Sequence, residues 1–596
     1  MSIVALEKVT LFGLAADKRR ALERLQELGC VHLQSLRAVT GEAEKSAPQQ
    51  PEAAGKALRY LLETGTRRHQ VVDPAGFDLD AVLAQVEANR ERTLAATDRR
   101  DFLETRIRDL EPWGDFHLPD PATLGGYRLW FYIVPNDRLR RLPRGGIAWS
   151  IVHRDARQSH VVAVARDEPG RDAMPAPRIH AGTVPLAELR GALEGACLEL
   201  EDLAAERAAL TRWIHLITRH LAHAENQAAL WQAGEMTLDT GDLFVIQGWA
   251  PRRAVPAIRG YAAGLGLALV AAAPGADDRP PTLLNNPEKV SGGQDLVSFF
   301  QTPGYKGWDP SRVLFFSFAL FFAMILGDAG YAALLLAFLL AGWRRLGRSP
   351  AGRRLRYLAL AMLGASVVYG VMVGSYFGVS PAPGGLLAGL QVLDINDYPT
   401  MMRLSVAVGV IHVTLANLIT AWRQDTWRAR LAPLGWCLAV VGGFIMWVGG
   451  PTGVELGTDL LGAGLVGVLL FTSARPWRRP ADLALRLVDG LLGLTRVSGA
   501  LGDILSYLRL FALGLASASL AVTFNTLAHD VHAALPGIGL LFALLILLLG
   551  HALNLALGIM SGVVHGLRLN YIEFYNWSLS DEGYPFRSFA KKEVTT

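Results

Sequence analysis

Charged residues and cysteines are scarce in this chain, and each scarcity excludes a class of protein. Asp, Glu, Lys and Arg make up only 19% of the 596 residues, whereas 51% are apolar, which excludes a disordered or nucleic-acid-binding protein. The formal net charge of +4 is too small to indicate an anionic partner. The three cysteines, Cys30, Cys197 and Cys437, are far apart and have no CxxC or zinc spacing. They predict neither a disulfide framework nor a metal site, and they fit a reducing compartment.

Targeting and nucleotide-binding motifs are missing as well. The first residues lack the basic region and apolar core of a signal peptide, so we expect the N-terminus to stay in the cytoplasm. Residues 1–290 contain no GxxxxGK[ST] loop and no nucleotide-binding glycine cluster. Nothing in this half therefore predicts that it binds ATP.

What the chain has instead is a sharp change of composition near residue 300. Charges are spread through residues 1–290, where no apolar run is long enough to span a bilayer, and after Lys306 the next lysine is Lys591. A linker of turn-forming residues, RPPTLLNNPEKVSGG, starts at Arg279 and separates the two halves. The sequence predicts a cytoplasmic N-terminal domain over residues 1–295 and an α-helical polytopic membrane domain over residues 296–596.

The cytoplasmic domain is predicted to hold two α/β lobes. A strand over residues 3–14, a helix over 17–28 closed by Gly29 and a strand over 30–33 form a small βαβ unit. Further strands are expected at 127–134, 159–165 and 243–249, with a helix at 255–265. We expect the lobes to cover about residues 1–75 and 120–170 with 238–275.

Helices over about 76–112 and 184–235 are predicted to join these lobes. From Leu186 to Leu221 apolar residues recur at alternating spacings of three and four, a pattern that over about five heptads is typical of a coiled coil. A weaker pattern runs from Val82 to Leu110. The simplest arrangement is an antiparallel coiled coil with an α/β lobe at each end, and an ordinary helical bundle is the alternative.

Arginine placement sets the number of membrane crossings. The loop 343–356 after the first of seven apolar runs holds six arginines, which places it in the cytoplasm by the positive-inside rule. The first run must then cross twice, with a hairpin break at Gly327-Asp328-Ala329-Gly330. The basic loops 423–430 and 475–486 lie inside, as do both termini. The eight expected crossings are 311–326, 330–343, 353–379, 401–422, 431–450, 458–473, 499–528 and 536–575, the last two long and tilted.

Charged and polar side chains inside these spans call for a structural or functional explanation, because placing a charge at mid-bilayer costs at least ~2.5 kcal/mol. Arg509 lies deep in the 499–528 run, and Arg568 lies nearer the end of the last run. Spacings of three and four place a polar stripe on one face of the last run, which favours a wet path. Its members are His551, Asn554, Gly558, Ser561, His565 and Arg568.

Structural explanations compete with a functional one at several of these positions. Either arginine can form a structural pair with Asp503 or Glu573. His412, alone in its helix, is expected to make an interhelical hydrogen bond. Asp328 is expected to cap or turn its hairpin, with ion handling as the alternative.

Short strings spread in order over the membrane half carry a further signal. They are PTLLNNP from Pro281, TPGY from Thr302, FFAMILGDAGY from Phe321, SYLRLFAL from Ser506, HGLRLNYIEFY from His565 and GYPF from Gly583. They resemble the a/I subunit of vacuolar- and archaeal-type (V/A-type) rotary ATPases: its entry to the membrane, first hairpin, penultimate helix, last helix and tail. The resemblance covers essentially the whole membrane half and, more weakly, the N-terminal half.

This resemblance implies a non-catalytic stator subunit without a cofactor. A chain this short that lacks a signal peptide is expected in the plasma membrane of a prokaryote. Ions, either protons or sodium, would cross against a rotating ring of proteolipid (c/K) subunits. Arg509 matches the family's critical arginine, which faces the ring carboxylate, and Arg568 matches a second arginine. The N-terminal arm would contact E/G-type peripheral-stalk subunits and the C/d-type subunit of the central stalk, below the soluble V1/A1 ATPase sector.

The match departs from the family at two positions. Some members have a histidine where this chain has Ser517 and a glutamate where it has Gly558, so the half-channel groups are assigned anew. The candidate ion-translocation residues are Arg509, Arg568, His565, Glu573, Ser561, His551 and Asp503, and the candidate hairpin residues are Gly327, Asp328 and Gly330.

Two other functions fit the sequence less well. A stand-alone secondary ion transporter with a cytoplasmic regulatory domain predicts inverted repeats with paired broken helices, and only one glycine-interrupted hairpin is evident. A membrane-anchored scaffold leaves the membrane arginines and the polar stripe unexplained.

Overall fold

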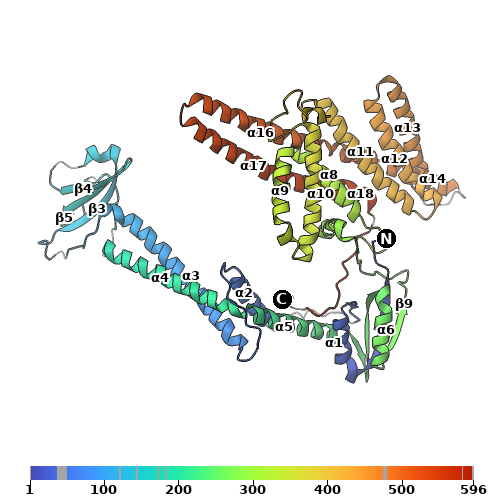
Figure 1. Ribbon diagram of the computed structural model, residues 1–596, viewed down its shortest axis with the longest axis horizontal. Helices are drawn as coiled ribbons and strands as arrows, with labels where there is room; N and C mark the ends of the chain where they lie inside the picture. The colour runs from blue at the N-terminus through green and yellow to red at the C-terminus, as the bar shows by residue number, and fades with distance from the viewer. Residues whose placement is uncertain are drawn as a thin grey trace. The chain divides into compact units, whose positions relative to one another are not determined.

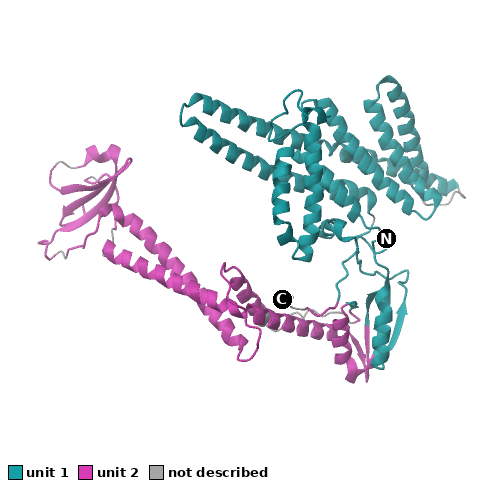
Figure 2. Ribbon diagram, in the orientation of Figure 1, with its two compact units in different colours: residues 1–12, 30–34, 247–588 teal, residues 13–29, 35–246, 589–596 magenta. Residues whose placement is uncertain are grey.

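In the computed structural model the described part of the chain is mostly helical, with two small β-sheets (Figure 1). The structure describes residues 2–36, 50–119, 122–142, 145–170, 173–180, 184–473, 475, 480–579 and 581–592. The chain divides into two compact units (Figure 2). Unit 1 comprises residues 1–12, 30–34 and 247–588, and unit 2 comprises residues 13–29, 35–246 and 589–596.

Unit 2 is built around two long antiparallel helices. Its helices are α1 (Lys18–Leu28), α2 (Gln50–Leu62), α3 (Leu79–Leu110), α4 (Leu186–Leu210) and α5 (Ile214–Glu235). Asn89 of α3 donates to the carbonyl of Leu203 at 3.1 Å, whereas Arg190 of α4 pairs with Glu111 after the end of α3 at 2.9 Å. These contacts establish opposite chain directions; the coiled coil itself stays a prediction.

The helix predicted over 184–235 is interrupted, and this is a correction. A 3₁₀ turn at Thr211–Trp213 separates α4 from α5. The Thr211 side chain is fully buried, donating to the carbonyl of Ala208 at 2.6 Å and accepting from the amide of Arg68 at 2.9 Å. A segment distant in sequence thus bonds to the turn. The unpredicted helix α2 packs against α5 and α3, so the two-helix rod is too simple.

An antiparallel sheet lies between α3 and α4 in the sequence of unit 2. Its strands are β3 (Arg128–Pro135), β4 (Ala148–Arg154), β5 (Gln158–Ala165) and β6 (Arg178–Ile179), in the order β4-β5-β3-β6. Alternate residues of β3 point to opposite faces. Phe131 packs with Trp113 and Leu110 in one cluster, whereas Trp130 and Tyr132 belong to another. Both faces of the strand are therefore covered.

The second sheet corrects the predicted βαβ unit. Its strands are β1 (Leu6–Leu14), β2 (His32–Gln34), β7 (Leu238–Thr240), β8 (Leu243–Pro251) and β9 (Ala268–Ala272). The order is β2-β8-β1-β9, with β7 paired to β8. The helix α1 ends at Gly29, which has φ +59°, as expected. The strand β8, from 200 residues or so later in the chain, lies between β1 and β2, and sequence periodicity alone does not reveal such an insertion.

Unit 1 carries the membrane helices. They are α8 (Ser311–Leu326), α9 (Ala329–Leu346), α10 (Pro350–Val373), α11 (Tyr398–Arg423), α12 (Trp427–Val448), α13 (Gly450–Phe471), α14 (Pro480–Leu494), α15 (Arg496–Leu505), α16 (Leu508–Ala534) and α17 (Gly539–Arg568). A π-helical segment (Leu569–Phe574) and α18 (Tyr575–Ser578) continue α17. Before them, α6 (Val255–Gly264) and α7 (Gly292–Phe300) precede the apolar helices.

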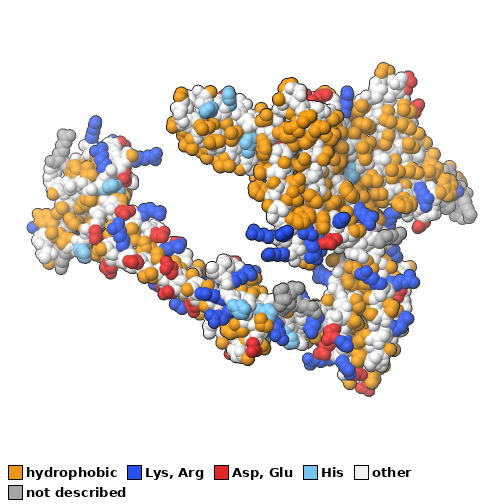
Figure 3. Space-filling view, viewed as in Figure 1, with side chains coloured by type: hydrophobic (Ala, Val, Ile, Leu, Met, Phe, Trp, Pro, Cys, Tyr) orange, Lys and Arg blue, Asp and Glu red, His pale blue; other side chains and the backbone are white. Residues whose placement is uncertain are grey.

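Seven helical segments among the described residues are long and apolar enough to cross a membrane. Their surfaces are covered largely by hydrophobic side chains (Figure 3). The helix α8 is apolar but has 16 residues, about 24 Å at 1.5 Å per residue, which is short of a ~30 Å hydrocarbon layer. Eight crossings thus remain a prediction that depends on α8.

The region predicted as a basic loop, 475–486, is partly helical. The helix α14 begins at Pro480, and residues 474 and 476–479 lie outside the described part of the chain. Arg486 is only 5% exposed and donates to the carbonyl of Leu470 at 2.7 Å. This arginine satisfies a free carbonyl at the end of α13 and is not a solvated loop charge.

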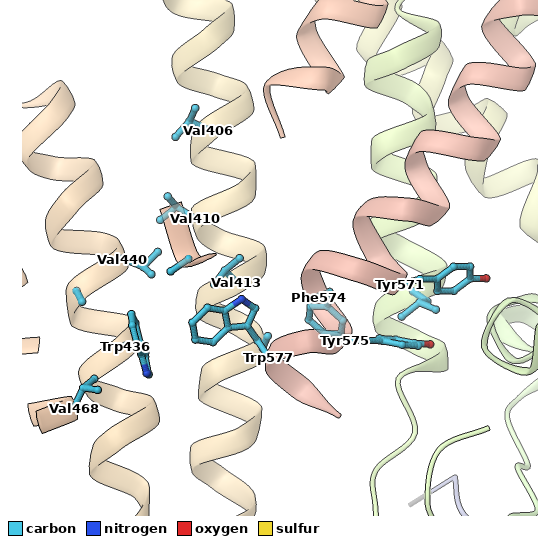
Figure 4. Close-up of a cluster of buried hydrophobic side chains, with 14 of the residues drawn as sticks. Val406, Val410, Val413, Trp436, Val440, Val468, Tyr571, Phe574, Tyr575 and Trp577 are labelled. Carbon is cyan, nitrogen blue, oxygen red and sulfur yellow. The ribbon is translucent and has the colours of Figure 1, made fainter. Parts of the chain in front are cut away.

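A buried apolar cluster anchors the C-terminal end of the last helix (Figure 4). Phe574 and Trp577 from the segment after α17 pack with Val413 of α11 and Trp436 of α12. The rings of Trp436 and Trp577 lie 5.2 Å apart. The cluster holds the end of the last helix against α11 and α12 and so positions the residues just before it.

Candidate functional site

Arg509 lies in the first turn of α16, and its neighbours fix where it points. Tyr507 and Leu510 are fully buried, and the Tyr507 hydroxyl lies 2.8 Å from Nδ1 of His412 on α11. A Cβ at Gly409 would lie 2.6 Å from the Tyr507 ring, so only glycine there admits this ring. The buried residues Tyr507 and Leu510 therefore fix the orientation of the first turn of α16. The predicted interhelical hydrogen bond of His412 is present.

The exposed side of the same helix carries Arg509. Its side chain is 24% exposed, and it shares the exposed face with Ala512, Ala516 and Ser519. These small residues follow at spacings of three and four, so one face of α16 combines a guanidinium with a shallow surface. A second helix can approach such a surface closely.

Glu573 lies opposite Arg509. It belongs to the π-helical segment after α17, its side chain is 2% exposed, and its Oε1 atom is 3.9 Å from Nη1 of Arg509. Hydrogen bonds between such groups measure about 2.7–2.9 Å, so this is a Coulombic contact without a hydrogen bond. Nη1 of Arg509 and Oε2 of Glu573 are both buried and have no hydrogen-bond partner among the described residues. Both side chains therefore retain the capacity to bind a further group.

The first part of the polar stripe is fully bonded inside the unit. His551 lies between the hydroxyl of Tyr331 on α9 (2.6 Å) and the amide oxygen of Asn525 on α16 (3.0 Å). Asn554, 1% exposed, donates to the Tyr331 hydroxyl at 3.1 Å and to the carbonyl of Ser517 at 2.9 Å. This network links three helices at one level.

The second part of the stripe is open. His565 is half-buried and its Nδ1 atom has no hydrogen-bond partner among the described residues. Ser561 is half-buried, and Arg568 is exposed on the face that also carries Met560 and Val564. Gly562 and Gly566, between them, pack against Phe322 and Phe318 of α8. The stripe thus runs from a bonded interior to an exposed end.

Asp503 is not part of this group. Its Oδ2 atom accepts a hydrogen bond from the indole nitrogen of Trp577 at 2.8 Å, which ties α15 to the end of the last helix. The structural pairing of either arginine with Asp503 is therefore not observed, and among the described residues Arg568 forms no ion pair with Glu573 either. Of these four candidate residues, as the structure describes them, Arg509 and Glu573 are the pair within ion-pair distance.

Asp328 is 4% exposed, and its partners among the described residues are backbone amides and one hydroxyl group. Its carboxylate accepts from the amides of Tyr331, Phe377 and Gly378 at 2.9–3.0 Å, and from the hydroxyl of Ser375 at 2.7 Å. The first of these is an N-cap of α9. These bonds connect the start of α9 with the segment after α10, as the predicted capping role requires.

The two glycines beside Asp328 are needed for different reasons. Gly327 ends α8 with φ +59°, and a Cβ at Gly330 would lie 2.5 Å from the ring of Phe377. The break thus divides the first apolar run into α8 and α9, both of which pack against α10.

The two positions where the chain departs from the resembled family are interior positions. Ser517 is 9% exposed and its hydroxyl lies 3.2 Å from the amide oxygen of Asn554. A Cβ at Gly558 would lie 3.2 Å from Leu326 and 3.8 Å from the Ser517 hydroxyl. Both residues are small because α8, α16 and α17 meet here.

Sequence reasoning missed Tyr331, Asn525 and Tyr507 as parts of this region. Tyrosine and asparagine at helix positions carry no spacing signal of their own, and these three come from helices whose packing decides the contacts. No three His, Cys, Asp or Glu side chains of the described residues come together as a metal-binding group.

The chain is similar in sequence to several proteins of known family. It is 25% identical to V-type ATP synthase subunit I of Borreliella burgdorferi over an alignment of 627 positions, which covers 99% of both chains. It is 28% identical over 454 residues to V-type ATP synthase subunit I of Chlamydia pneumoniae, covering 63% of this chain and 65% of that protein. With A-type ATP synthase subunit I of Methanocaldococcus jannaschii, identity is 27% over 60% of this chain and 56% of that protein.

Two further comparisons, with protein-family models and with solved structures, add no closer relationship. No protein-family model matches the chain. The crystal structure of the cytoplasmic N-terminal domain of subunit I, homolog of subunit a, of V-ATPase matches with 15% identity and a TM-score of 0.24, covering 44% of this chain and 99% of that one.

Proposed function

Because this chain is a homologue of the subunit I proteins of V-type and A-type ATP synthases, we propose that it is the membrane stator subunit of a V/A-type rotary ATPase or ATP synthase. It is a multi-pass protein of a prokaryotic plasma membrane with both termini in the cytoplasm. It holds no catalytic site or cofactor. It conducts protons or sodium ions and couples their passage to rotation of a proteolipid ring.

The observation that carries this proposal is the setting of Arg509. A ring carboxylate that faces lipid must be neutral, because an exposed charge there is costly. When it meets the fixed guanidinium of Arg509 on the small-residue face of α16, its ionised form is favoured and the ion is released. The same cation blocks ions from passing straight between the two access paths.

The two parts of the polar stripe supply the access paths. His551 and His565 are 14 residues apart, about 21 Å along a helix. The group at His551 meets α16 at Asn525, 16 residues beyond Arg509, whereas His565 and Arg568 lie close enough to Arg509 to interact with it electrostatically. The carboxylate of Glu573, whose Oε1 atom lies 3.9 Å from Nη1 of Arg509, stabilises the guanidinium from inside the helix bundle. Two displaced half-channels of this kind convert rotation into transport across the membrane.

The cytoplasmic residues connect this machinery to the rest of the complex. The arm formed by the helices and sheet of unit 2 contacts the E/G-type peripheral-stalk subunits and the C/d-type subunit of the central stalk, which link it to the soluble V1/A1 ATPase sector. We infer these partners because the relatives are named as subunits of V-type ATP synthases. A stand-alone transporter is not favoured by these relatives.

The decisive experiment is Arg509→Ala in the purified complex reconstituted into liposomes. Removing the cation removes the group that ionises the ring carboxylate, so we expect ATP-driven ion uptake to fall by roughly tenfold or more. Arg496→Ala is the matched control, since Arg496 is exposed on α15 and stacks on Trp577 at 5.2 Å. Uptake near the wild-type rate in an intact Arg509→Ala complex contradicts the assigned role.

A further inference from the structure

The turn between α9 and α10 carries an unusual density of arginines at one end of the membrane unit. Six lie within 13 residues: Arg344, Arg345, Arg348, Arg353, Arg354 and Arg356. Figure 3 shows Lys and Arg side chains gathered beside the hydrophobic surface of the α9–α10 pair. The structure divides these arginines by the partners that they have.

Three of the six are engaged within the unit. Arg353 pairs with Glu288 at 3.0 Å and Arg354 pairs with Asp295 at 2.8 Å. The guanidinium of Arg356 lies 4.7 Å from the ring centre of Trp343 and 5.1 Å from that of Tyr357. These contacts neutralise two charges and hold the third against aromatic rings.

The other three have no such partner. Arg344, Arg345 and Arg348 are exposed, and their guanidinium groups form no hydrogen bond or ion pair with any described residue. They follow directly on the apolar surface of α9, where Leu340 is 56% exposed and Phe338 is 66% exposed. Three uncompensated positive charges thus border a lipid-facing surface.

Trp343 and Tyr357 mark the level of the membrane surface at this point. Their rings meet edge to face with centres 5.7 Å apart, Trp343 in the last turns of α9 and Tyr357 in the second turn of α10. Tryptophan and tyrosine concentrate at the headgroup level of bilayers. The three free guanidinium groups, one to five residues beyond Trp343, therefore lie at the level of lipid phosphates.

We propose that Arg344, Arg345 and Arg348 form a binding site for the headgroups of anionic phospholipids. The planar guanidinium matches a phosphate in a two-pronged hydrogen bond, and juxtamembrane basic clusters attract acidic lipids. Arg353 and Arg354 bind carboxylates of their own chain and contribute little. The inference concerns the lipid environment and does not depend on the proposed function.

The test measures binding of fluorescently tailed phosphatidylglycerol to the purified full chain in neutral detergent micelles. Arg344→Gln combined with Arg345→Gln is expected to weaken binding by about fivefold for each arginine removed. The control, Arg353→Gln with Arg354→Gln, removes the same number of charges from the same turn and is expected to change binding less than about twofold, because those two are already paired.

Three results overturn the proposal. The first is unchanged binding in the Arg344/Arg345 variant, and the second is an equal loss in both double variants, which reports net charge alone. The third is competition by millimolar inorganic phosphate as effective as that by unlabelled phosphatidylglycerol, which identifies a free-anion site. Phosphatidylcholine is expected not to compete, and an unchanged thermal unfolding midpoint shows that the variants are folded.

Discussion

At the residue scale, the membrane unit separates polar side chains that are fully bonded from ones that are not. Asp328 accepts four hydrogen bonds, and His551 and Asn554 bond across three helices. Arg509 and Glu573, by contrast, stand 3.9 Å apart with buried atoms unbonded. Because an unbonded buried polar atom costs free energy, we infer that Asp328 serves the fold and that Arg509 and Glu573 serve transport.

Asp328→Asn separates these two roles. The amide nitrogen of asparagine would replace either Oδ2, which accepts from Ser375 and Gly378, or Oδ1, which accepts from Tyr331 and Phe377. In either orientation it faces two donors, so we expect a loss of about 1–3 kcal/mol of stability and a lower thermal unfolding midpoint in detergent. Ion uptake per folded complex is expected to stay close to wild type. A variant that unfolds normally but no longer transports would assign Asp328 to ion handling.

At the scale of elements, glycines let helices approach until their backbones touch. The helices α12 and α13 meet along Gly435, Gly442, Gly457 and Gly464, where an added Cβ would come within 2.4–2.7 Å of backbone atoms of the other helix. Such pairs are typical of membrane helices, where close van der Waals packing replaces the hydrophobic effect. The close packing of α12 against α13 therefore depends on the absence of side chains at these four glycines.

Two adjacent glycines of α12 test this. A Cβ at Gly442 would lie 2.5 Å from the amide nitrogen of Leu461, whereas Gly443 has no atom within 4 Å. Gly442→Ala is expected to cost about 1–3 kcal/mol by forcing the helices apart. Gly443→Ala should be neutral or slightly stabilising, since alanine is the better helix former. Equal unfolding midpoints for the two variants would contradict the packing.

At the scale of the whole molecule, the chain joins a charged half to an apolar half. The relatives that align along its full length are subunits of ATP synthases, and the large exposed apolar face of α17, including Leu541, Leu548 and Leu549, is suited to lipid or to the apolar surface of a rotor. A chain with this surface is expected to be one component of a larger membrane complex.

Purification in mild detergent tests that expectation. The chain, affinity-tagged in its native host, should bring down a proteolipid of small mass and soluble ATPase subunits in constant proportion. We expect high salt to strip the soluble subunits first, because their contacts lie in water, where salt screens them. Recovery of the chain alone, or only with copies of itself, supports the secondary transporter instead.

The sequence by itself determined most of the helices, whereas the predicted division at residue 295 does not coincide with the two compact units, because unit 1 comprises residues 1–12, 30–34 and 247–588. Apolar runs and the change in lysine use near residue 300 located the membrane part, because burial in lipid tolerates few charges. Gly29 and Gly327 marked helix ends through their need for positive φ. The string around Arg509 carried the family resemblance.

Only the tertiary structure decided how distant segments meet. The insertion of β8 between β1 and β2 and the hydrogen bond from the amide of Arg68 to the turn at Thr211 depend on contacts between residues far apart in sequence. The burial of Arg486 depends on the packing of α14 against the end of α13. The same is true of the pairing of Arg509 with Glu573 and of the network that includes Tyr331. Periodicity reports which face of a helix is polar, whereas the identity of the partner is settled by packing between helices.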